Sequence, residues 1–197
     1  MDGYIREMET ILNDTIIPKI IHKICLNFYY LELEYVYPSC YKIDRLNNKI
    51  ISKNGADGTC FIGKWMNKNK IYEIIFKIDI WKGSFNVAFG LGPDDTTINK
   101  AAQFCSDVGY VYYTGGSVFI GRKSHKIEKA IAREGDTIKL IYNRRIKQSH
   151  KLLISINEKK SIVLFDNIKD NKYKWTVSLS SAPNDECTIL DIKEIET

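Results

Sequence analysis

The chain has 197 residues, of which 44% are hydrophobic and 27% charged, as is typical of a globular protein. This length suits one large β domain or two small ones, and it buries enough surface to need no disulfide or metal staple. No apolar run approaches the ~20 residues of a membrane span, and Met1 to Glu7 lack the apolar segment of a secretory signal. We therefore expect an intracellular, cytoplasmic protein.

The charge and the cysteines narrow the classes of partner and site. A net charge of +5 is compatible with an acidic partner, but it is spread along the chain and basic proteins are often simply soluble. An odd number of scattered cysteines without C-x-x-C spacing argues against zinc or redox work. We expect reduced, mostly buried thiols and no metal or cofactor; the cysteines are Cys25, Cys40, Cys60, Cys105 and Cys187.

Residues 1–38 are predicted to form a helical N-terminal segment. Asp14 or Thr15 can cap its start, and Pro18 suits a first turn, where the missing N–H costs little. Apolar residues recur every three or four positions, which predicts one apolar helix face. This face must pack on the rest of the chain or on a partner; it comprises Ile17, Ile20, Ile24, Phe28 and Leu31.

After Pro38 the pattern changes to short alternating strands. A hairpin is expected around Asn47 and Asn48, because Asn tolerates the positive φ of tight turns. A strand follows over 58–65, and "IYEIIFKIDIW" and "SFNVAFGLG" are predicted to pair as a hairpin across Lys82 and Gly83. One face of the first of these strands is apolar, and we expect the other face, with Glu73, Lys77 and Asp79, to be solvated.

Residues 93–107 form the longest polar interruption, predicted as a surface loop or short helix. Strands resume on both sides of a Gly115–Gly116 turn, over 137–142, on both sides of a Glu158–Lys159 turn, and in "WTVSLSS" and "ECTILDIKEI". About a dozen short strands with few helices indicate an antiparallel sandwich or barrel over residues 39–197.

Four blocks, in order, resemble those of SPRY domains, which share their plan with concanavalin-like lectins. They are "KIYEIIFKIDIWKGSFNVAFGLG", "DVGYVYYTGGSVFIGRK", "REGDTIKLIYN", and "LLISINEKKSIVLFDNI" followed by "KYKWTVSLSS". Departures affect turns: Asn143 stands where Asp is usual, Glu158 where Gly is common, and the hairpin "NRRIKQSH" is longer. The resemblance implies a mainly β, two-sheet antiparallel jelly roll, preceded here by an α-helix.

The resemblance also implies a non-catalytic protein-interaction module that holds a peptide or partner protein in loops at one end. Aromatic anchors dominate interface energies, and loop acids can orient a basic partner. Trp65 and Trp175 have core packing as the alternative role, and 93–95 can be a plain loop. The residues we select for partner binding are Trp65, Pro93, Asp94, Asp95, Tyr113 and Trp175.

The stretch "EGDTIKLIYNRR" raises the question whether Asp136 is a catalytic acid and whether its arginines bind phosphate. We favour structural roles for both. Gly135 permits a tight entry to the strand, and Asp136 can accept backbone N–H bonds there. Arg144, Arg145 and Lys147 are interpreted as a solvated hairpin tip.

Catalysis has little support. His22, His125 and His150 lack a recognisable nucleophile motif, and Glu73 and Asp79 lie six residues apart with Lys77 between them. Asp94 and Asp95 alone fall short of a calcium site. We predict that the chain is not an enzyme.

Other binding functions remain as alternatives. Tyr110, Tyr112 and Tyr113 near Arg122 could stack on nucleic acid, but the period places Tyr110 and Tyr112 inward and Tyr113 outward. A second alternative is a structural subunit that docks through the helix. A third is a carbohydrate-binding sandwich, which predicts exposed aromatic residues along the concave sheet.

Overall fold

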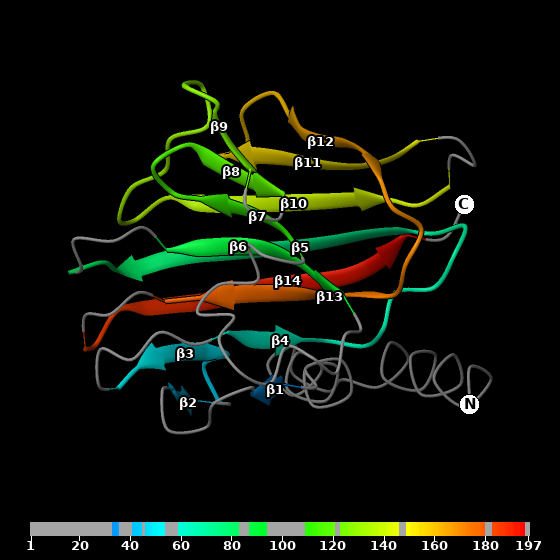
Figure 1. Ribbon diagram of the computed structural model, residues 1–197. Helices are drawn as coiled ribbons and strands as arrows, with labels where there is room; N and C mark the ends of the chain where they lie inside the picture. The colour runs from blue at the N-terminus through cyan, green and yellow to red at the C-terminus, as the bar shows by residue number, and fades with distance from the viewer. Residues whose placement is uncertain are drawn as a thin grey trace, which may run out of the picture.

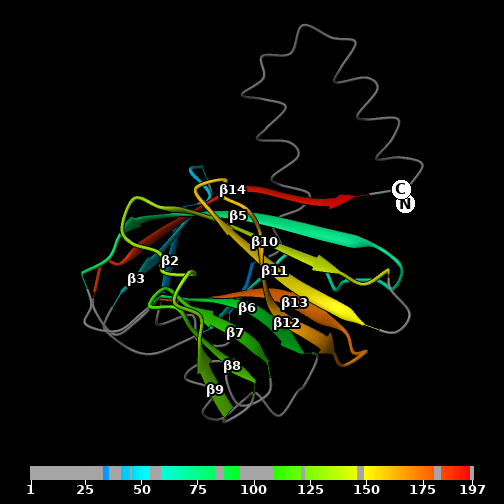
Figure 2. The same cartoon turned by 90° about the horizontal axis from the view of Figure 1, so that it is seen from above.

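The computed structural model describes residues 33–35, 41–44, 46–53, 59–82, 87–93, 109–120, 123–145, 149–179 and 183–195. Over these residues the chain forms two antiparallel sheets stacked face to face (Figures 1 and 2). The predicted mainly β sandwich is therefore confirmed. The predicted helix with its apolar face at Ile17 to Leu31 lies outside the described residues.

Sheet A has seven described strands in the order β1-β4-β13-β6-β7-β8-β9. The predicted hairpin around Gly116, which has φ +87°, is present as β7 and β8. Strand β9 was not predicted from the sequence, because a short run of lysine, serine and histidine lacks an apolar face. The strands are β1 (Leu33–Tyr35), β4 (Cys60–Ile62), β6 (Ala88–Pro93), β7 (Tyr110–Tyr113), β8 (Ser117–Ile120), β9 (Lys123–Lys126) and β13 (Tyr173–Ser178).

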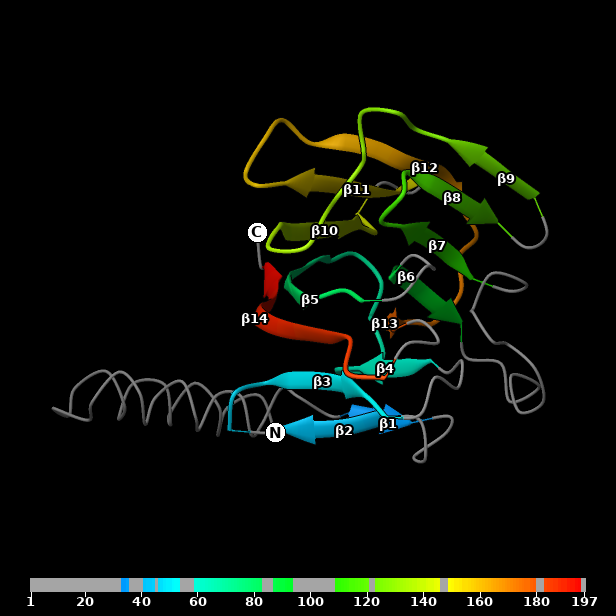
Figure 3. The ribbon, with the colours of Figure 1, turned by 90° about the vertical axis from the view of Figure 1, so that its left-hand side faces the viewer.

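Sheet B also has seven described strands, in the order β12-β11-β10-β5-β14-β3-β2, with β12 and β2 at its two edges (Figure 3). Its middle is formed by β5 and β14, which pair along most of their length. The strands are β2 (Tyr41–Asp44), β3 (Lys49–Ser52), β5 (Ile71–Ile80), β10 (Thr137–Asn143), β11 (His150–Ile156), β12 (Ile162–Ile168) and β14 (Glu186–Ile195).

The core lies between the sheets and follows the alternation of the sequence. Phe76 of β5 and Phe89 of β6 meet across it with ring centroids 4.6 Å apart, and both are fully buried. On β7, Tyr110 and Tyr112 point inward as predicted, while Tyr113 on the other face is half-buried. Apolar burial of this kind is the main favourable term in folding, at about 25 cal/mol per Å².

The predicted pairing of the 71–80 and 84–92 stretches is wrong. β5 pairs with β10 and β14 in sheet B, whereas β6 pairs with β13 and β7 in sheet A. The chain thus changes sheets between them instead of forming a hairpin. Alternation reports only which face of a strand is buried, and it fits a partner across the sandwich as well as one alongside.

The Gly-Leu-Gly stretch of β6 is explained by packing. A Cβ at Gly92 would lie 2.4 Å from Cε1 of Phe61 and 2.7 Å from Cγ2 of Thr176. A Cβ at Gly90 would lie 2.0 Å from the carbonyl oxygen of Tyr110. Both glycines therefore allow neighbouring strands and rings to approach β6 closely.

Two of the predicted turns have the conformation that their residues favour. Asn48, between β2 and β3, has φ 52°. Asp136 accepts hydrogen bonds from the Arg133 backbone N–H at 2.8 Å and from the Asn157 side chain at 2.7 Å. The structural interpretation of Asp136 is confirmed.

The β11–β12 turn generates a stability prediction. Glu158 has φ 59°, in the left-handed region that costs a non-Gly residue about 1–2 kcal/mol. We expect Glu158→Gly to raise the free energy of unfolding by roughly 1 kcal/mol, measured by urea denaturation. Lys160→Gly, at an exposed position beyond the turn, should give no gain. Equal effects of the two changes would contradict the strain at Glu158.

Candidate partner-binding surface

The sandwich has two ends that differ in how their loops are held. At one end, β10 finishes and β5 begins, and the connections 63–70 and 169–172 lie beside them, on the right of Figure 1. We call this the Arg144 end. At the other end, Asp185 accepts a hydrogen bond from the Lys82 amide at 2.7 Å, and the Trp81 amide donates to Glu134. We call it the Asp185 end.

Arg144 connects two of the loops at the Arg144 end. Its side chain is buried, with 2% of the residue exposed; Nη1 donates to the Met66 carbonyl at 2.5 Å and Nη2 to Oδ1 of Asp170 at 2.6 Å. The Arg144 amide also donates to the Lys70 carbonyl at 3.0 Å. The predicted solvated tip is therefore wrong for Arg144, because its guanidinium fills a site between two loops where several donors can be satisfied at once.

Arg145 and Lys147 have different outcomes. Arg145 is half-buried, and its Nη2 donates to the Ile195 carbonyl at 3.1 Å, so it too is not a free tip. Lys147 lies outside the described residues.

Asp170 connects the buried arginine to the surface. Its carboxylate also lies 2.5 Å from Nζ of Lys68, and it stays 44% exposed. The Lys68 hydrogen bond, followed by that from Arg144, holds the pKa of Asp170 below its usual value. Lys68, Asp170 and Arg144 therefore fasten the 63–70 connection to the 169–172 connection.

Buried tyrosines on the core side form hydrogen bonds with the same two connections. The Lys169 amide donates to the Tyr110 hydroxyl at 3.0 Å, and the Tyr173 hydroxyl donates to the Lys169 carbonyl at 3.0 Å. The Met66 amide donates to the Tyr173 carbonyl at 2.9 Å, while the Asn67 amide donates to the Tyr72 hydroxyl at 2.6 Å. Burial raises the pKa of Tyr72 to about 12, so its hydroxyl stays protonated at neutral pH.

Trp65 presents a half-buried ring at this end. Nζ of Lys174 lies 4.8 Å from the ring centroid, close enough for a cation–π contact. Lys174 itself is 1% exposed on β13, so its ammonium supports the ring from the protein side. Pro93 ends β6 opposite Tyr173 and is buried. Trp65 and Pro93 thus both lie at the Arg144 end, but only Trp65 has surface exposed there, and its role in partner binding stays a prediction.

Trp175 and Tyr113 are not part of the exposed surface at the Arg144 end. Trp175 is 2% exposed and belongs to the core, so it has almost no surface to offer a partner. Tyr113 pairs with Ala88 at the Asp185 end, where its ring packs on Phe119 with centroids 4.8 Å apart. Asp94 and Asp95 lie outside the described residues. The sequence missed Arg144 and Asp170, which no short motif distinguishes from surface charges.

Groups that could support catalysis do not form a reactive site where the structure describes them. The rings of His150 and Tyr142 meet edge to face at 6.3 Å, and burial, then the charge of Arg144, lowers the pKa of His150. Burial raises the pKa of the Cys60 thiol to about 12, which keeps it protonated and a poor nucleophile. His125 is exposed on β9, and His22 lies outside the described residues.

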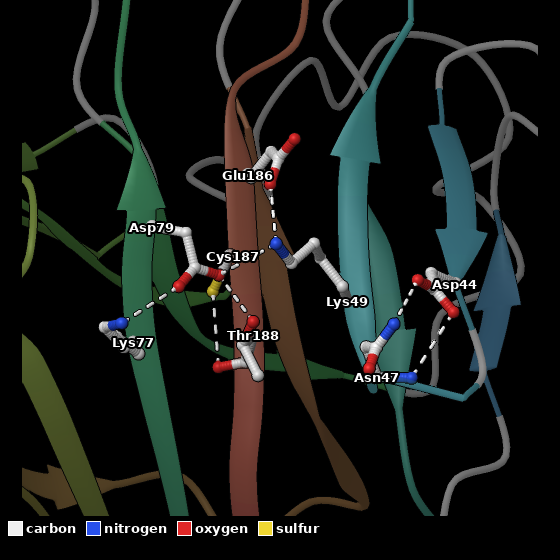
Figure 4. A network of polar contacts seen from close by, with 8 residues as sticks. All are labelled: Asp44, Asn47, Lys49, Lys77, Asp79, Glu186, Cys187 and Thr188. Atoms are coloured by element: carbon white, nitrogen blue, oxygen red, sulfur yellow. Dashed lines mark hydrogen bonds and ion pairs between the residues drawn. The ribbon is translucent and has the colours of Figure 1, made fainter.

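The acids of β5 are each neutralised by neighbours. Asp79 accepts a hydrogen bond from Oγ1 of Thr188 at 2.5 Å and lies 3.4 Å from Nζ of Lys77 (Figure 4). Lys49 spans from β3 to Glu186 at 2.7 Å and to Asp79 at 3.9 Å. These contacts tie β3, β14 and β5 together on the outer face of sheet B.

The prediction that Glu73 of β5 is solvated is wrong. Glu73 is 6% exposed, with Nζ of Lys193 at 2.9 Å and of Lys139 at 3.9 Å. Six residues of extended strand separate it from Asp79 by about 20 Å. Paired glycosidase carboxylates lie no more than about 9.5 Å apart, so this pair cannot act together.

The described residues contain neither a metal-binding cluster nor a membrane-spanning helix. No group of three or more His, Cys, Asp or Glu side chains there could hold a metal ion. In that same part of the chain, no helix has the length and apolar character needed to cross a membrane.

Comparison with solved structures identifies the fold. The SPRY domain of human HERC1 superposes with a TM-score of 0.65 at 13% identity, covering 81% of this chain and 94% of that one. The neuralized NHR1 domain of Drosophila melanogaster gives 0.55 at 16% identity, covering 82% and 98%. The carbohydrate recognition domain of Emp46p, in a metal-free form, gives 0.53 at 16% identity, covering 85% and 88%.

No protein-family model matches the sequence, and no curated protein matches it significantly. At these identities the likeness establishes the fold alone. The chain is a SPRY-like sandwich.

The buried arginine generates a second prediction. Arg144→Met leaves the Met66 carbonyl without its partner inside the protein, and we expect a loss of about 2–3 kcal/mol in the free energy of unfolding. Lys68→Met removes an ion pair of the same carboxylate, but at an exposed position that contributes about 1 kcal/mol or less. Urea denaturation of both variants measures the difference, and similar losses would contradict the central role of Arg144.

Asp170 generates a prediction for acid. Because its pKa is lowered in the folded protein, its contribution to stability is present above the unfolded pKa and is lost as pH falls through the folded pKa. The stability difference between wild type and Asp170→Asn should therefore shrink between about pH 5 and pH 2. Asp166→Asn, at an exposed position of β12, is the control. A difference that stays constant over this range would refute the contribution of the Asp170 charge.

Proposed function

We propose that the chain is a non-catalytic protein-interaction module whose contacts are made by the loops of the Arg144 end. The observation that carries this proposal is the buried guanidinium of Arg144, which joins the Met66 carbonyl to the Asp170 carboxylate. It supports the proposal because loops ordered before binding lose less conformational entropy when a partner docks. The partner is a peptide or protein segment that crosses this rim.

Trp65 is the anchor within this surface. Partly exposed tryptophans that are held on one side are frequent hot spots, because a large rigid ring buries much area at little entropic cost. The Lys174 ammonium under the ring fixes its orientation. SPRY and NHR1 domains among the similar structures are compatible with such a role, and at low identity they support it only as a fold able to present loops.

A carbohydrate-binding role has less support, although Emp46p has a carbohydrate recognition domain of similar fold. Sugar rings are often bound by stacking on exposed aromatic side chains. The outward-facing described side chains of β5, β10 and β14 include no aromatic residue, since Tyr72, Phe76 and Tyr142 all point into the core. The half-buried pair of Tyr113 and Phe119 lies on sheet A instead.

A role as a structural subunit stays a prediction, because it depends on the apolar face of residues 17–31. Removing residues 1–32 tests whether this segment docks on another chain or packs on its own sandwich. A folded, monomeric remainder favours docking of this segment on another chain, whereas loss of folding favours packing on the chain's own sandwich.

The proposed function is tested by affinity capture from the native host with two aromatic variants. We expect Trp65→Ala to reduce recovery of the partner about tenfold, as the loss of an anchor worth roughly 1–2 kcal/mol implies. Tyr113→Ala, at the Asp185 end, should leave recovery unchanged, with circular dichroism confirming that both variants fold. The proposal fails if Tyr113→Ala abolishes capture and Trp65→Ala does not.

A further inference from the structure

The described connections at the two ends of the sandwich differ in charge. Among their described residues, the connections 63–70, 144–149 and 169–172 carry one acid, Asp170, against Arg144, Arg145 and five lysines. These lysines are Lys64, Lys68, Lys70, Lys169 and Lys172. The described connections of the Asp185 end are nearly balanced, with six cations, Lys53, Lys82, Lys129, Arg133, Lys159 and Lys160, and five acids, Glu128, Glu134, Asp136, Glu158 and Asp185.

The cations of the Arg144 end divide into two groups. Arg144 and Arg145 are engaged with backbone carbonyls, and Lys68 and Lys70 form ion pairs with Asp170 and Glu194. Three lysines, Lys64, Lys169 and Lys172, are exposed beside them. Lys64 adjoins Trp65 in the sequence, and the other two flank Asp170. The described connections of the Arg144 end, one of which carries Trp65, therefore have an excess of positive charge.

We propose that the Arg144 end binds an acidic segment of its protein partner, with Lys64, Lys169 and Lys172 meeting the segment's carboxylates. This inference rests on the proposed function and gives the partner its chemistry. The expectation that Asp94 and Asp95 orient a basic partner stays a prediction, because both residues lie outside the described part of the chain. Exposed charges of one sign attract an oppositely charged segment and speed its association, an effect that salt weakens.

A peptide fits this surface better than a nucleic acid does. Sequence-tolerant binding of single strands needs several aromatic rings on which successive bases stack. In the described part of the Arg144 end, the indole of Trp65 and the imidazole of His150 are half-buried, while Tyr72, Tyr110, Tyr142 and Tyr173 are each at most 8% exposed. The described surface therefore offers too few rings for a run of bases. Bidentate phosphate recognition also favours free arginines, and here both described arginines are already engaged.

The test compares two triple charge reversals in the full chain. Lys64→Glu/Lys169→Glu/Lys172→Glu changes the Arg144 end, and Lys129→Glu/Lys159→Glu/Lys160→Glu changes the Asp185 end by the same net charge at equally exposed positions. Fluorescence anisotropy measures binding of three labelled probes over a salt series. The probes are a 12-residue peptide of alternating Glu and Leu, the same peptide with Lys for Glu, and a 12-nucleotide single-stranded DNA.

We expect wild type to bind the Glu peptide more tightly than the other two probes, with affinity that falls as salt rises. The Arg144-end reversal should weaken this binding at least ~10-fold, while the Asp185-end reversal changes it less than about twofold. Equal losses in the two reversals, no binding of the Glu peptide, or tighter binding of DNA would each overturn the inference. If the wild type does not bind the Glu peptide although capture of a partner still depends on Trp65, the acidic partner is refuted while the interaction module stands.

Discussion

The buried guanidinium of Arg144 is the interaction on which the organisation of this surface depends. Burying a guanidinium costs free energy that hydrogen bonds offset, and here a backbone carbonyl and a carboxylate pair Nη1 and Nη2, while the buried Nε has no hydrogen-bond partner in the described structure. Because these acceptors belong to different connections, the cost of burying the charge is offset only when both connections occupy their positions. The buried charge of Arg144 thus favours the ordered positions of the connections 63–70 and 169–172. Hydrogen bonds with Tyr72, Tyr110 and Tyr173 stabilise the same two connections.

This arrangement relates the fold to its proposed use. The two sheets form a rigid core whose stability depends little on the sequences of the loops. The loops at one end can therefore differ in charge from those at the other. At the Arg144 end the described arginines are engaged within the protein, whereas Trp65, which lies beside Lys174, and the exposed lysines are the residues that we propose for a partner. The acids on the outer face of sheet B have a different role, since lysine neighbours tie them into the sheet (Figure 4).

The sequence predicts the sandwich well because alternation and turn chemistry are local signals. Asn48, Gly116 and Asp136 have the turn roles expected of them, and Tyr112 is buried as its period requires. Partners distant in sequence were predicted poorly. The pairing of β5 with β6 failed because alternation does not identify a neighbour, and Arg144 was interpreted as solvated because its acceptors, Met66 and Asp170, lie 78 and 26 residues away.

Hydrogen exchange of the Arg144→Met variant tests the central claim most directly, because it reads the order of individual loops. The account predicts that the amides of Met66, Asn67 and Lys169, which donate to Tyr173, Tyr72 and Tyr110, are protected in the wild type. In the variant these amides should exchange faster, while those of Asn157 and Gly135 at the Asp185 end keep their rates. Unchanged protection at the three amides, or equal loss at both ends, would contradict it.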